Sequence, residues 1–379
     1  MELLHKGFDA LDVSYAVHFP EKFMPILHQA KQKAGEIKAP VMVSLDGVGF
    51  NVSSGGMQGG YAFWCSTGSA GENWGIKMPN TKDPWGVRVS VSAIQTALLG
   101  LGGVKERLES KFERLGIPLR QGQESISRVD FALDFIMPNF DLVTDNFVMH
   151  PRFGWKRHVP ITEYKEAGRT GRTQSVTVGK NPGRQIIVYD KRAEVLAKGK
   201  SHWPLVWNKS REKQGLPALD LSDGENSQVW RVELRAYKRH LKEDWGVTTW
   251  SQLEKKLPEI FNGLLSDIRY TRPTLDATRS RWPEHELWAR VRKELQDDLS
   301  KMKSFATESA IAEVLKAERE QMLMAQIVGC ALSLAASRNI EFVGLSSFAR
   351  TLGGEIKELF RDNPAKTERK FAQAKGKIT

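Results

Sequence analysis

The stretch "RVDFALDF", residues 128–135, alternates strictly between apolar residues and polar or small ones. Successive side chains of a β-strand point to opposite faces of a sheet, so this alternation predicts a strand with one apolar and one polar face. The apolar set is Val129, Phe131, Leu133 and Phe135, and the other set is Arg128, Asp130, Ala132 and Asp134. An apolar face packed on a core is expected of an antiparallel sheet, but two carboxylates in the middle of the opposite face require an explanation.

Two later segments show the same pattern and extend this polar face. In "VWRVELRAY", residues 229–237, one face consists of Arg231, Glu233, Arg235 and Tyr237. In "QIIVYDK", residues 185–191, the residues that share a side are Ile187, Tyr189 and Lys191. Together with "SVTVG", residues 175–179, these runs predict a central antiparallel sheet. The simplest interpretation is a half-solvated sheet with cross-strand ion pairs, such as one between Asp130 and Arg231.

The concentration of acidic, basic and tyrosine side chains also fits a catalytic face. Carboxylates on a rigid sheet suit a hard divalent cation, Mg²⁺ or Mn²⁺, which would neutralise and polarise a phosphodiester. A tyrosine oxygen nearby could attack phosphorus and form a covalent phosphotyrosine, while arginines hold the phosphate oxygens through paired hydrogen bonds. A free phenol has a pKa of about 10, and a metal together with Lys191 would favour the phenolate of Tyr189.

The rest of the chain divides into β-rich and helical segments. Helices are expected at about 20–37, 93–115, 191–198 and 249–269, with short strands between 40 and 92. Strand signals stop near residue 278, and residues 284–361 are almost entirely helical in character. The predicted fold is α+β, a central antiparallel sheet with helices on one face, followed by an all-α domain. The expected divisions are a catalytic domain at 1–278 (a duplicated-looking β-rich part at 40–120 and a motif-bearing part at 121–278), a helical domain at 279–362 and a loose basic tail at 363–379.

The positive charge of the chain is concentrated in one window. The net charge is +11 over 379 residues, and residues 150–215 hold fifteen Lys and Arg against five Asp and Glu, an excess of ten. Such a concentration favours a polyanionic partner, most often nucleic acid, over a merely solvated surface. Trp155, Trp203 and Trp207 lie in the same window and suit stacking on single-stranded bases, although tryptophans are more often core residues.

The overall composition, 40% hydrophobic and 27% charged, is that of a soluble globular protein with two or three domains. No apolar run approaches the roughly 18–20 residues that span a bilayer, and the first residues lack a signal-peptide pattern. Cys65 and Cys330 lie far apart without metal-binding spacing, as expected of free thiols in a reducing compartment. These features predict a cytoplasmic protein with no membrane partner.

The motifs "SRVDFALDF", "VTVGKNPGRQIIVYDKRAE" and "WRVELRAYKRHL", in this order and spacing, resemble the replication initiation factor (Rep_trans) family. Its members start rolling-circle replication of plasmids and filamentous phages, and relatives act as relaxases of integrative conjugative elements. The segments "GFDALDVSYAV" and "VRVSVSAIQTALLGLGGV" fit the same layout, so the resemblance covers about residues 7–270. Family members often carry an aromatic residue before the glycine of the preceding strand, where this chain has Val178.

The resemblance implies a nickase- or relaxase-like palm that cuts one strand of single-stranded or cruciform origin DNA. The family uses acidic metal ligands, and the eight histidines of this chain form no His-x-His pair. Carried over by motif, Tyr189 is the nucleophile, and Lys191 and Arg235 assist it. The implied ligands of Mg²⁺ or Mn²⁺ are Asp130 and Glu233, with Asp134 as a further ligand. The expected DNA contacts are Arg128, Arg169, Arg172, Lys180, Arg184, Arg192 and Arg231.

Several alternatives remain open at this point. A relaxase for conjugative transfer would share the chemistry, whereas a non-catalytic nucleic-acid-binding protein would form no covalent adduct. Tyr237 and Tyr164 are rival nucleophiles, and a metal-activated water would make the protein a hydrolytic nuclease instead. The helical domain could recognise origin duplex or recruit a helicase, and the chain could form an oligomer.

Overall fold

The structure is a computed structural model, and it describes residues 1–68, 70–149, 164–169 and 172–375. The chain divides into two compact units, Met1–Glu308 and Ser309–Thr379. The domain boundary expected near residue 278 therefore falls inside the first unit, because Leu287, Trp288 and Val291 of α6 (Glu286–Glu294) are buried in its core. Within the described ranges, no helix is both long enough and apolar enough to cross a membrane.

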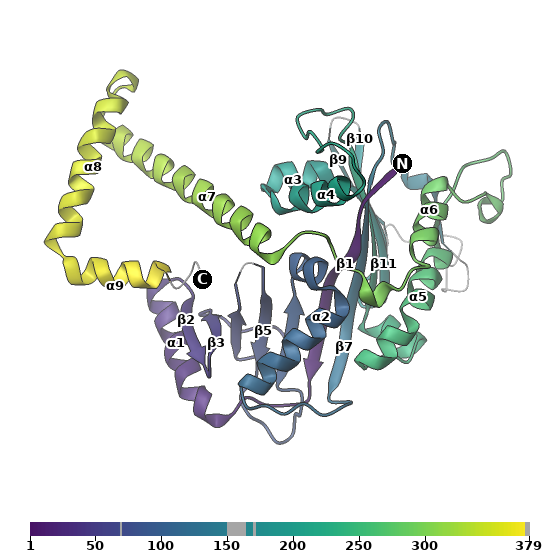
Figure 1. The fold of residues 1–379 in the computed structure, drawn as a ribbon, viewed down its shortest axis with the longest axis horizontal. Coiled ribbons are helices and arrows are strands. Elements are labelled where there is room, and N and C mark those ends of the chain that lie inside the picture. Colours follow the sequence, from purple (N-terminus) through teal and green to yellow (C-terminus); the bar gives the residue numbers. More distant parts are fainter. Residues whose placement is uncertain (69, 150–163, 170–171, 376–379) are drawn as a thin grey trace. The chain divides into compact units, whose positions relative to one another are not determined.

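An antiparallel sheet of eleven strands organises the first unit, in the order β2-β3-β4-β5-β6-β1-β7-β12-β11-β10-β9 (Figure 1). The strands predicted from the alternating segments are confirmed, and with them the α+β fold class with a helical C-terminal region. The strand bounds are β1 Glu2–Tyr15, β2 Val41–Leu45, β3 Val48–Val52, β4 Phe63–Ser66, β5 Glu72–Ile76, β6 Val87–Val91, β7 Glu124–Ile136, β9 Tyr164–Arg169, β10 Arg172–Lys180, β11 Arg184–Asp190 and β12 Val229–Tyr237. A separate two-stranded sheet pairs β8 (Phe147–Met149) with β13 (Ile268–Tyr270).

The apolar face of the large sheet forms one continuous core with the helices packed on it. These helices are α1 (Met24–Ile37), α2 (Ala93–Arg114), α5 (Trp250–Asp267) and α6. Phe131 of β7 lies edge-on to Phe8 of β1, with ring centroids 5.3 Å apart, and also contacts Phe261 of α5. The alternation in "RVDFALDF" thus supplies the apolar side of the strand, as its sequence predicted.

Local sequence signals explain where the helices begin. Thr249 and Gln252 form a capping box at the start of α5, so two backbone donors of its first turn are satisfied. Asp190, the residue after Tyr189, caps α3 (Lys191–Lys198) by accepting a hydrogen bond from the Ala193 amide at 2.8 Å. The chain therefore turns from strand to helix directly after the tyrosine.

Two features of the first unit were not predicted. The helices α3 and α4 (His202–Lys213) lie on the polar face of the sheet, opposite the helices that cover the core. The long strand β1 pairs with β7 through three register shifts, one of them between Phe8 and Ala10. Such bulges leave a residue unpaired and turn its side chain, here that of Asp9.

The second unit is helical. It comprises most of α7 (Glu308–Ser337) together with α8 (Leu345–Asp362) and α9 (Pro364–Lys375). Within the tail expected at 363–379, residues 364–375 form the helix α9, whose sequence "PAKTERKFAQAK" begins with the proline favoured at a first helical position and continues with good helix formers.

Candidate active site

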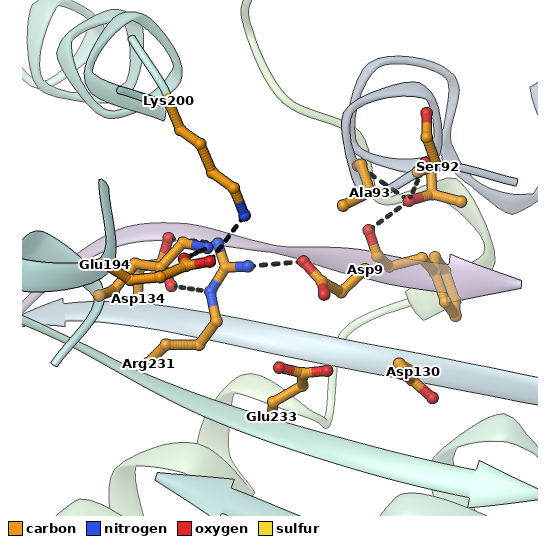
Figure 2. A network of polar contacts seen from close by, with 12 residues as sticks. Asp9, Ser92, Ala93, Asp130, Asp134, Glu194, Lys200, Arg231 and Glu233 are labelled. Atoms are coloured by element: carbon orange, nitrogen blue, oxygen red, sulfur yellow. Dashed lines mark hydrogen bonds and ion pairs between the residues drawn. The ribbon is translucent and has the colours of Figure 1, made fainter. Parts of the chain in front are cut away.

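Strand register gathers the predicted residues on the polar face of four neighbouring strands. Across β7 and β12, Asp134 lies opposite Arg231, Ala132 opposite Glu233, and Asp130 opposite Arg235. On the far side of β12, β11 places Tyr189 opposite Arg231. Figure 2 shows Glu233 and Asp9 between the Asp134–Arg231 pair on one side and Asp130 on the other. The polar face therefore has two ends, separated by the small residues Gly7 and Ala132, which pair with each other.

At the first end, Asp134 and Arg231 form a fully buried ion pair. The Arg231 Nε and Nη2 atoms donate to the two carboxylate oxygens of Asp134 at 2.6 and 2.8 Å. Trp207 of α4 donates from Nε1 to the same carboxylate at 2.8 Å, and Trp203 lies against the guanidinium, 4.0 Å from its ring centroid. Although burial opposes ionisation, the charge of Arg231 keeps the pKa of Asp134 below its ordinary value.

This arrangement corrects one expectation and argues against two others. Arg231 pairs with Asp134 and with Asp9, whose Oδ1 lies 2.5 Å from Nη1, and not with Asp130, because the antiparallel register places Asp130 opposite Arg235. Both oxygens of Asp134 already accept hydrogen bonds in a fully buried site, which argues against a metal-ligand role for it. The full burial of Arg231 likewise argues against the expected phosphate contact.

At the second end, two carboxylates are held by arginines that solvent reaches. Arg128 contacts both oxygens of Asp130, with Nε 2.9 and 3.1 Å away. Arg235 lies between the carboxylates, since its Nε is 2.6 Å from Glu233 Oε1 and 3.4 Å from Asp130 Oδ2. Asp130 and Glu233 are buried, whereas the side chains of Arg128 and Arg235 are 29% and 25% exposed.

The electrostatics of the second end differ from those of the first. Burial, reinforced by the nearby charge of Glu233, raises the pKa of Asp130 to about 7 in spite of its arginine partners. Asp134 is equally buried, but the charge and the hydrogen bonds of Arg231 outweigh burial and lower its pKa. The second end differs in that a second carboxylate, Glu233, lies close to the buried one.

Two neighbouring carboxylates, Asp130 and Glu233, are the groups on this face that could hold a divalent cation. Among the described residues, no three or more His, Cys, Asp or Glu side chains gather closely enough to enclose a metal ion. Mg²⁺, however, is commonly held by one or two carboxylates and takes its other ligands from water and phosphate. The pair can act as such a two-carboxylate site only if Arg235, which bridges it here, moves aside and Arg128 releases one of the two Asp130 oxygens.

Tyr189 and Lys191 meet where β11 passes into α3. The Lys191 Nζ donates to Tyr189 Oη at 3.4 Å and to Glu194 Oε2 at 2.6 Å. Burial, and after it the charge of Arg231, lowers the pKa of Lys191 to about 8. Burial also raises the pKa of Tyr189 well above its ordinary value. The protein groups alone therefore favour the phenol form of Tyr189, which lies beside an amine whose own pKa is lowered.

The rival tyrosine Tyr237 has a different environment. Its hydroxyl donates to Gln185 Oε1 at 2.8 Å, and its ring is buried under Arg128. In the described part of the chain, the contacts that hold it include no lysine comparable to Lys191. The side chain of Tyr164, the other rival, lies outside the described residues.

The predicted DNA-contacting residues whose side chains the structure describes do not form one open patch. Arg184 makes an ion pair with Asp267 at 3.0 Å and is largely buried, and Arg192 donates to the Leu221 carbonyl at 2.6 Å. Lys180 is exposed at the end of β10. The side chains of Arg169 and Arg172 lie outside the described residues, as does Trp155. Trp203 and Trp207 are buried in the cover of the first end, so they are core residues and not stacking surfaces.

Sequence reasoning missed three groups that complete the face. Asp9 reaches Arg231 only because of the bulge in β1, which breaks the alternation that would have revealed it. Glu194 binds Lys191, Lys198 and Lys200, with Nζ–oxygen distances of 2.6, 2.9 and 2.6 Å. Trp203 and Trp207 are four residues apart, so on a helix they lie on the same side. This spacing could have predicted that both tryptophans cover the same part of the sheet.

No protein-family model matches the chain, and no curated protein matches it. Among solved structures, the chain is similar to the rolling circle replication initiator protein from Geobacillus stearothermophilus, with 17% sequence identity and a TM-score of 0.40. The alignment covers 79% of this chain and 98% of that protein. At this level of identity and overlap, the likeness assigns no role to any residue of this chain.

Proposed function

We propose that this protein is a tyrosine-dependent DNA-nicking endonuclease that initiates rolling-circle replication on single-stranded or cruciform origin DNA. The observation that carries the proposal is the 3.4 Å contact between Lys191 Nζ and Tyr189 Oη, on the same sheet face as the Asp130–Arg235–Glu233 group. A nucleophile, a base and a charged phosphate-binding group thus lie on one rigid sheet, which is the arrangement that covalent phosphoryl transfer requires.

The proton of the tyrosine has a defined route. Because Tyr189 is a phenol at neutral pH, attack on phosphorus requires a base at its oxygen, and the neutral form of Lys191 can accept this proton. A bond then forms between Tyr189 Oη and phosphorus, and the bond from phosphorus to the 3′ oxygen breaks. The 3′ oxygen takes a proton from water, and the 5′ end stays on the enzyme as a phosphotyrosine. Glu194 holds Lys191 in place through its 2.6 Å contact.

The negative charge of the phosphate would be neutralised at the second end of the face. Arg235, which is partly exposed, can reach a phosphate oxygen once it leaves the carboxylates that it bridges. Asp130 and Glu233 would hold Mg²⁺ or Mn²⁺. Such a cation supplies positive charge that neutralises and polarises the phosphodiester. Arg128, which contacts both oxygens of Asp130, would release one of them to the cation and hold the other.

The test is a covalent-adduct assay. The full chain is incubated with end-labelled single-stranded origin DNA and Mn²⁺ and is then resolved on a denaturing gel. We expect a labelled protein band that disappears in Tyr189→Phe, which keeps the ring and removes only the hydroxyl, and persists in the matched control Tyr237→Phe. DNA affinity should be equal in both variants.

Other outcomes identify the competing functions. An adduct that maps to Tyr237 or Tyr164 would keep the enzyme class and reject this site. Normal cleavage by Tyr189→Phe, with no adduct in any protein, would indicate an activated water as the nucleophile. Binding without cleavage in the wild type, with Mg²⁺ as with Mn²⁺, would leave a non-catalytic DNA-binding protein. A cut site at a transfer origin instead of a replication origin would identify a relaxase.

A further inference from the structure

The polar face of the large sheet continues past the candidate active site, across β1 and the strands beyond it. Strand register places one residue of each strand in a row that begins at the second end and runs away from Tyr189. The row contains Arg128 of β7, Asp12 of β1, Ser90 of β6, Asn73 of β5, Ser66 of β4 and Asn51 of β3. From β7 to β4 it crosses four strand spacings, about 19 Å. We call these residues the polar row.

The polar row differs from the covered side of the same strands. On that side, Phe50, Trp74 and Val89 are buried in the core formed with α1 and α2. The members of the row on β1, β6, β5, β4 and β3 are only partly buried. Because their side chains are short and carry hydroxyl, amide or carboxylate groups, the surface above them is shallow and polar. Such a surface suits a flat ligand with hydrogen-bonding edges.

Trp64 lies beside the polar row, on the same face of β4. Its side chain is 43% exposed, and its Nε1 donates to Asn73 Oδ1 at 3.4 Å. The residue opposite it on β5 is Gly75, where a Cβ would lie 3.0 Å from Tyr61 Cγ and 2.9 Å from Met57 Sδ. Both side chains therefore occupy the space next to the indole. Trp64 is thus held in place while much of its surface stays open, which is the condition for stacking a base.

The charges along the polar row favour a single strand over duplex DNA. Arg88 Nη2 lies 2.9 Å from Asp12 Oδ2, and Arg128 contacts both oxygens of Asp130. These cations are neutralised within the protein, so the row offers little to a phosphate backbone, which is the main contact that duplex DNA provides. A single strand also presents unpaired bases, which stack on aromatic rings and form hydrogen bonds with amide and hydroxyl groups.

A protein partner fits this face less well. The centre of a protein interface is a continuous apolar patch. Met42 of β2 is 48% exposed, but β3 with the polar Asn51 lies between it and Trp64. The face therefore presents single apolar side chains among polar ones.

We infer that Trp64 and the polar row bind the bases of single-stranded DNA that continues from the active site. The row begins at Arg128, so a strand whose phosphate lies at the second end has a continuous route across β1, β6 and β5 to Trp64. This inference rests on the proposed function for the position of the strand, but the contact itself requires no cleavage.

The experiment measures the binding of the full chain to a labelled oligothymidylate of about 20 nucleotides by fluorescence anisotropy, since stacking surfaces of this kind cover about 4–16 nucleotides. The buffer contains no divalent metal. Trp64→Ala should weaken the affinity by about five- to a hundredfold, as expected for the loss of one stacked base. Trp64→Phe keeps an aromatic ring and should retain most of the affinity.

Two comparisons make this test specific. Trp282→Ala is the matched control, because it removes a partly exposed indole from the segment between β13 and α6, and it should bind as the wild type does. The slope of log affinity against log salt should be the same in Trp64→Ala as in the wild type, because no phosphate contact is lost. Affinity for a duplex of the same length should also stay the same.

Each result decides the inference. Wild-type affinity in Trp64→Ala would overturn it and would mean that another part of the chain or a protein partner covers the indole. An equal loss in Trp282→Ala, or a loss that is equal for single strand and duplex, would overturn it as well. If Trp64→Ala shows the expected loss but the wild type forms no covalent adduct with origin DNA, the nicking function fails and this binding surface stands. An adduct on Tyr189 with normal binding by Trp64→Ala would have the opposite meaning.

Asn73→Asp provides a second test that keeps the tryptophan. Aspartate has the size of asparagine and still accepts the hydrogen bond from Trp64 Nε1, so the fold should be retained while a negative charge enters the polar row. We expect it to weaken single-strand binding by at least about fivefold, because the charge repels the strand. If thermal unfolding shows that Trp64→Ala does not fold, Asn73→Asp decides alone, and its binding as tightly as the wild type would overturn the inference.

Discussion

The two ends of the polar face are built from the same kinds of residue and yet differ in nearly every physical property. At the first end, Asp134 has one bidentate arginine and a tryptophan, all of them buried beneath α3 and α4. At the second end, Asp130 has Arg128 and shares Arg235 with Glu233, and both arginines are partly exposed. The pKa of Asp134 is lowered, whereas the pKa of Asp130 is raised to about 7.

This contrast shows why burial alone does not identify a reactive carboxylate. Both aspartates are fully buried on one strand, with the row of Ala132 and Glu233 between them. What differs is the arrangement of the charges around each carboxylate and whether solvent or a substrate can reach its partners. An ion pair whose members are all buried stabilises the fold. Two carboxylates that are held by exposed arginines can exchange those arginines for a cation, and the arginines can then bind a phosphate.

The largest expected effect is on chemistry at the second end. Asp130→Asn and Glu233→Gln keep the size of the side chains and remove the charge that would hold a divalent cation. We expect nicking to fall at least about a thousandfold in each variant, since metal-assisted charge neutralisation contributes several kcal/mol. DNA affinity and the thermal midpoint should change little. The measurement is single-turnover nicking over a titration of Mn²⁺.

The Mn²⁺ titration can also contradict this prediction. If both variants nick at the wild-type rate with an unchanged metal dependence, Asp130 and Glu233 are ion-pair partners of Arg235 and nothing more. The comparison between the two ends would then lose its functional meaning, although the structural contrast would stand.

The second largest effect is a loss of stability when the ion pair at the first end is broken. Asp134→Asn leaves Arg231 buried with only Asp9 as a charged partner, and breaking one side of a buried pair costs about 3 to 5 kcal/mol. We therefore expect Asp134→Asn to lower the free energy of unfolding by about 3 kcal/mol in urea titrations. Asp130→Asn is the matched control and should lower it far less. Equal losses in the two variants would mean that the ends do not differ as their contacts indicate.

The pH dependence of these two variants should have opposite signs. The depressed pKa of Asp134 stabilises the fold above the unfolded value of about 4, and this contribution is lost as pH falls through the folded pKa. The raised pKa of Asp130 means that the unfolded chain binds fewer protons between about pH 4 and 7, so stability falls as pH rises through this window. In the absence of divalent metal, the free energy of unfolding of Asp130→Asn should no longer fall between about pH 4 and 7. The loss of stability caused by Asp134→Asn should disappear at acidic pH.

The sequence predicted which residues share the polar face, but not how they pair or what covers them. The alternation of "RVDFALDF" and "VWRVELRAY" sufficed to place Asp130, Asp134, Arg231 and Glu233 on one face. The alternation could not predict the ion pairs across the strands. The register between β7 and β12 decides that Arg235, and not Arg231, lies opposite Asp130. The cover over Asp134 could not be predicted either, since it depends on how α4 returns to the sheet and brings Trp207 to the carboxylate.

A smaller effect concerns the base beside the tyrosine. If Lys191 accepts the proton of Tyr189, nicking should rise with pH and level off above about 8, where the amine is neutral. Lys191→Gln should reduce the nicking rate by about a hundredfold and flatten this profile. Lys198→Gln, which removes another lysine from the same Glu194 carboxylate, is the matched control and should keep the profile. An unchanged profile in Lys191→Gln would show that a different group takes the proton.

The smallest expected effect extends the contrast between exposed and buried charge to DNA binding. Lys180 and Arg184 face each other across the hairpin of β10 and β11, but Lys180 is exposed whereas Arg184 is largely buried against Asp267. Removing one cation that binds a phosphate should reduce the slope of log affinity against log salt by about 0.7 to 0.9. Lys180→Gln should therefore reduce the slope by one such step, and the triple change with Arg169→Gln and Arg172→Gln by more. Arg184→Gln should leave the slope unchanged, because its charge is already neutralised within the protein. A slope that falls equally in Lys180→Gln and Arg184→Gln would mean that DNA displaces Asp267 from Arg184, so that ion pairs on this sheet do not protect a cation from the phosphate backbone.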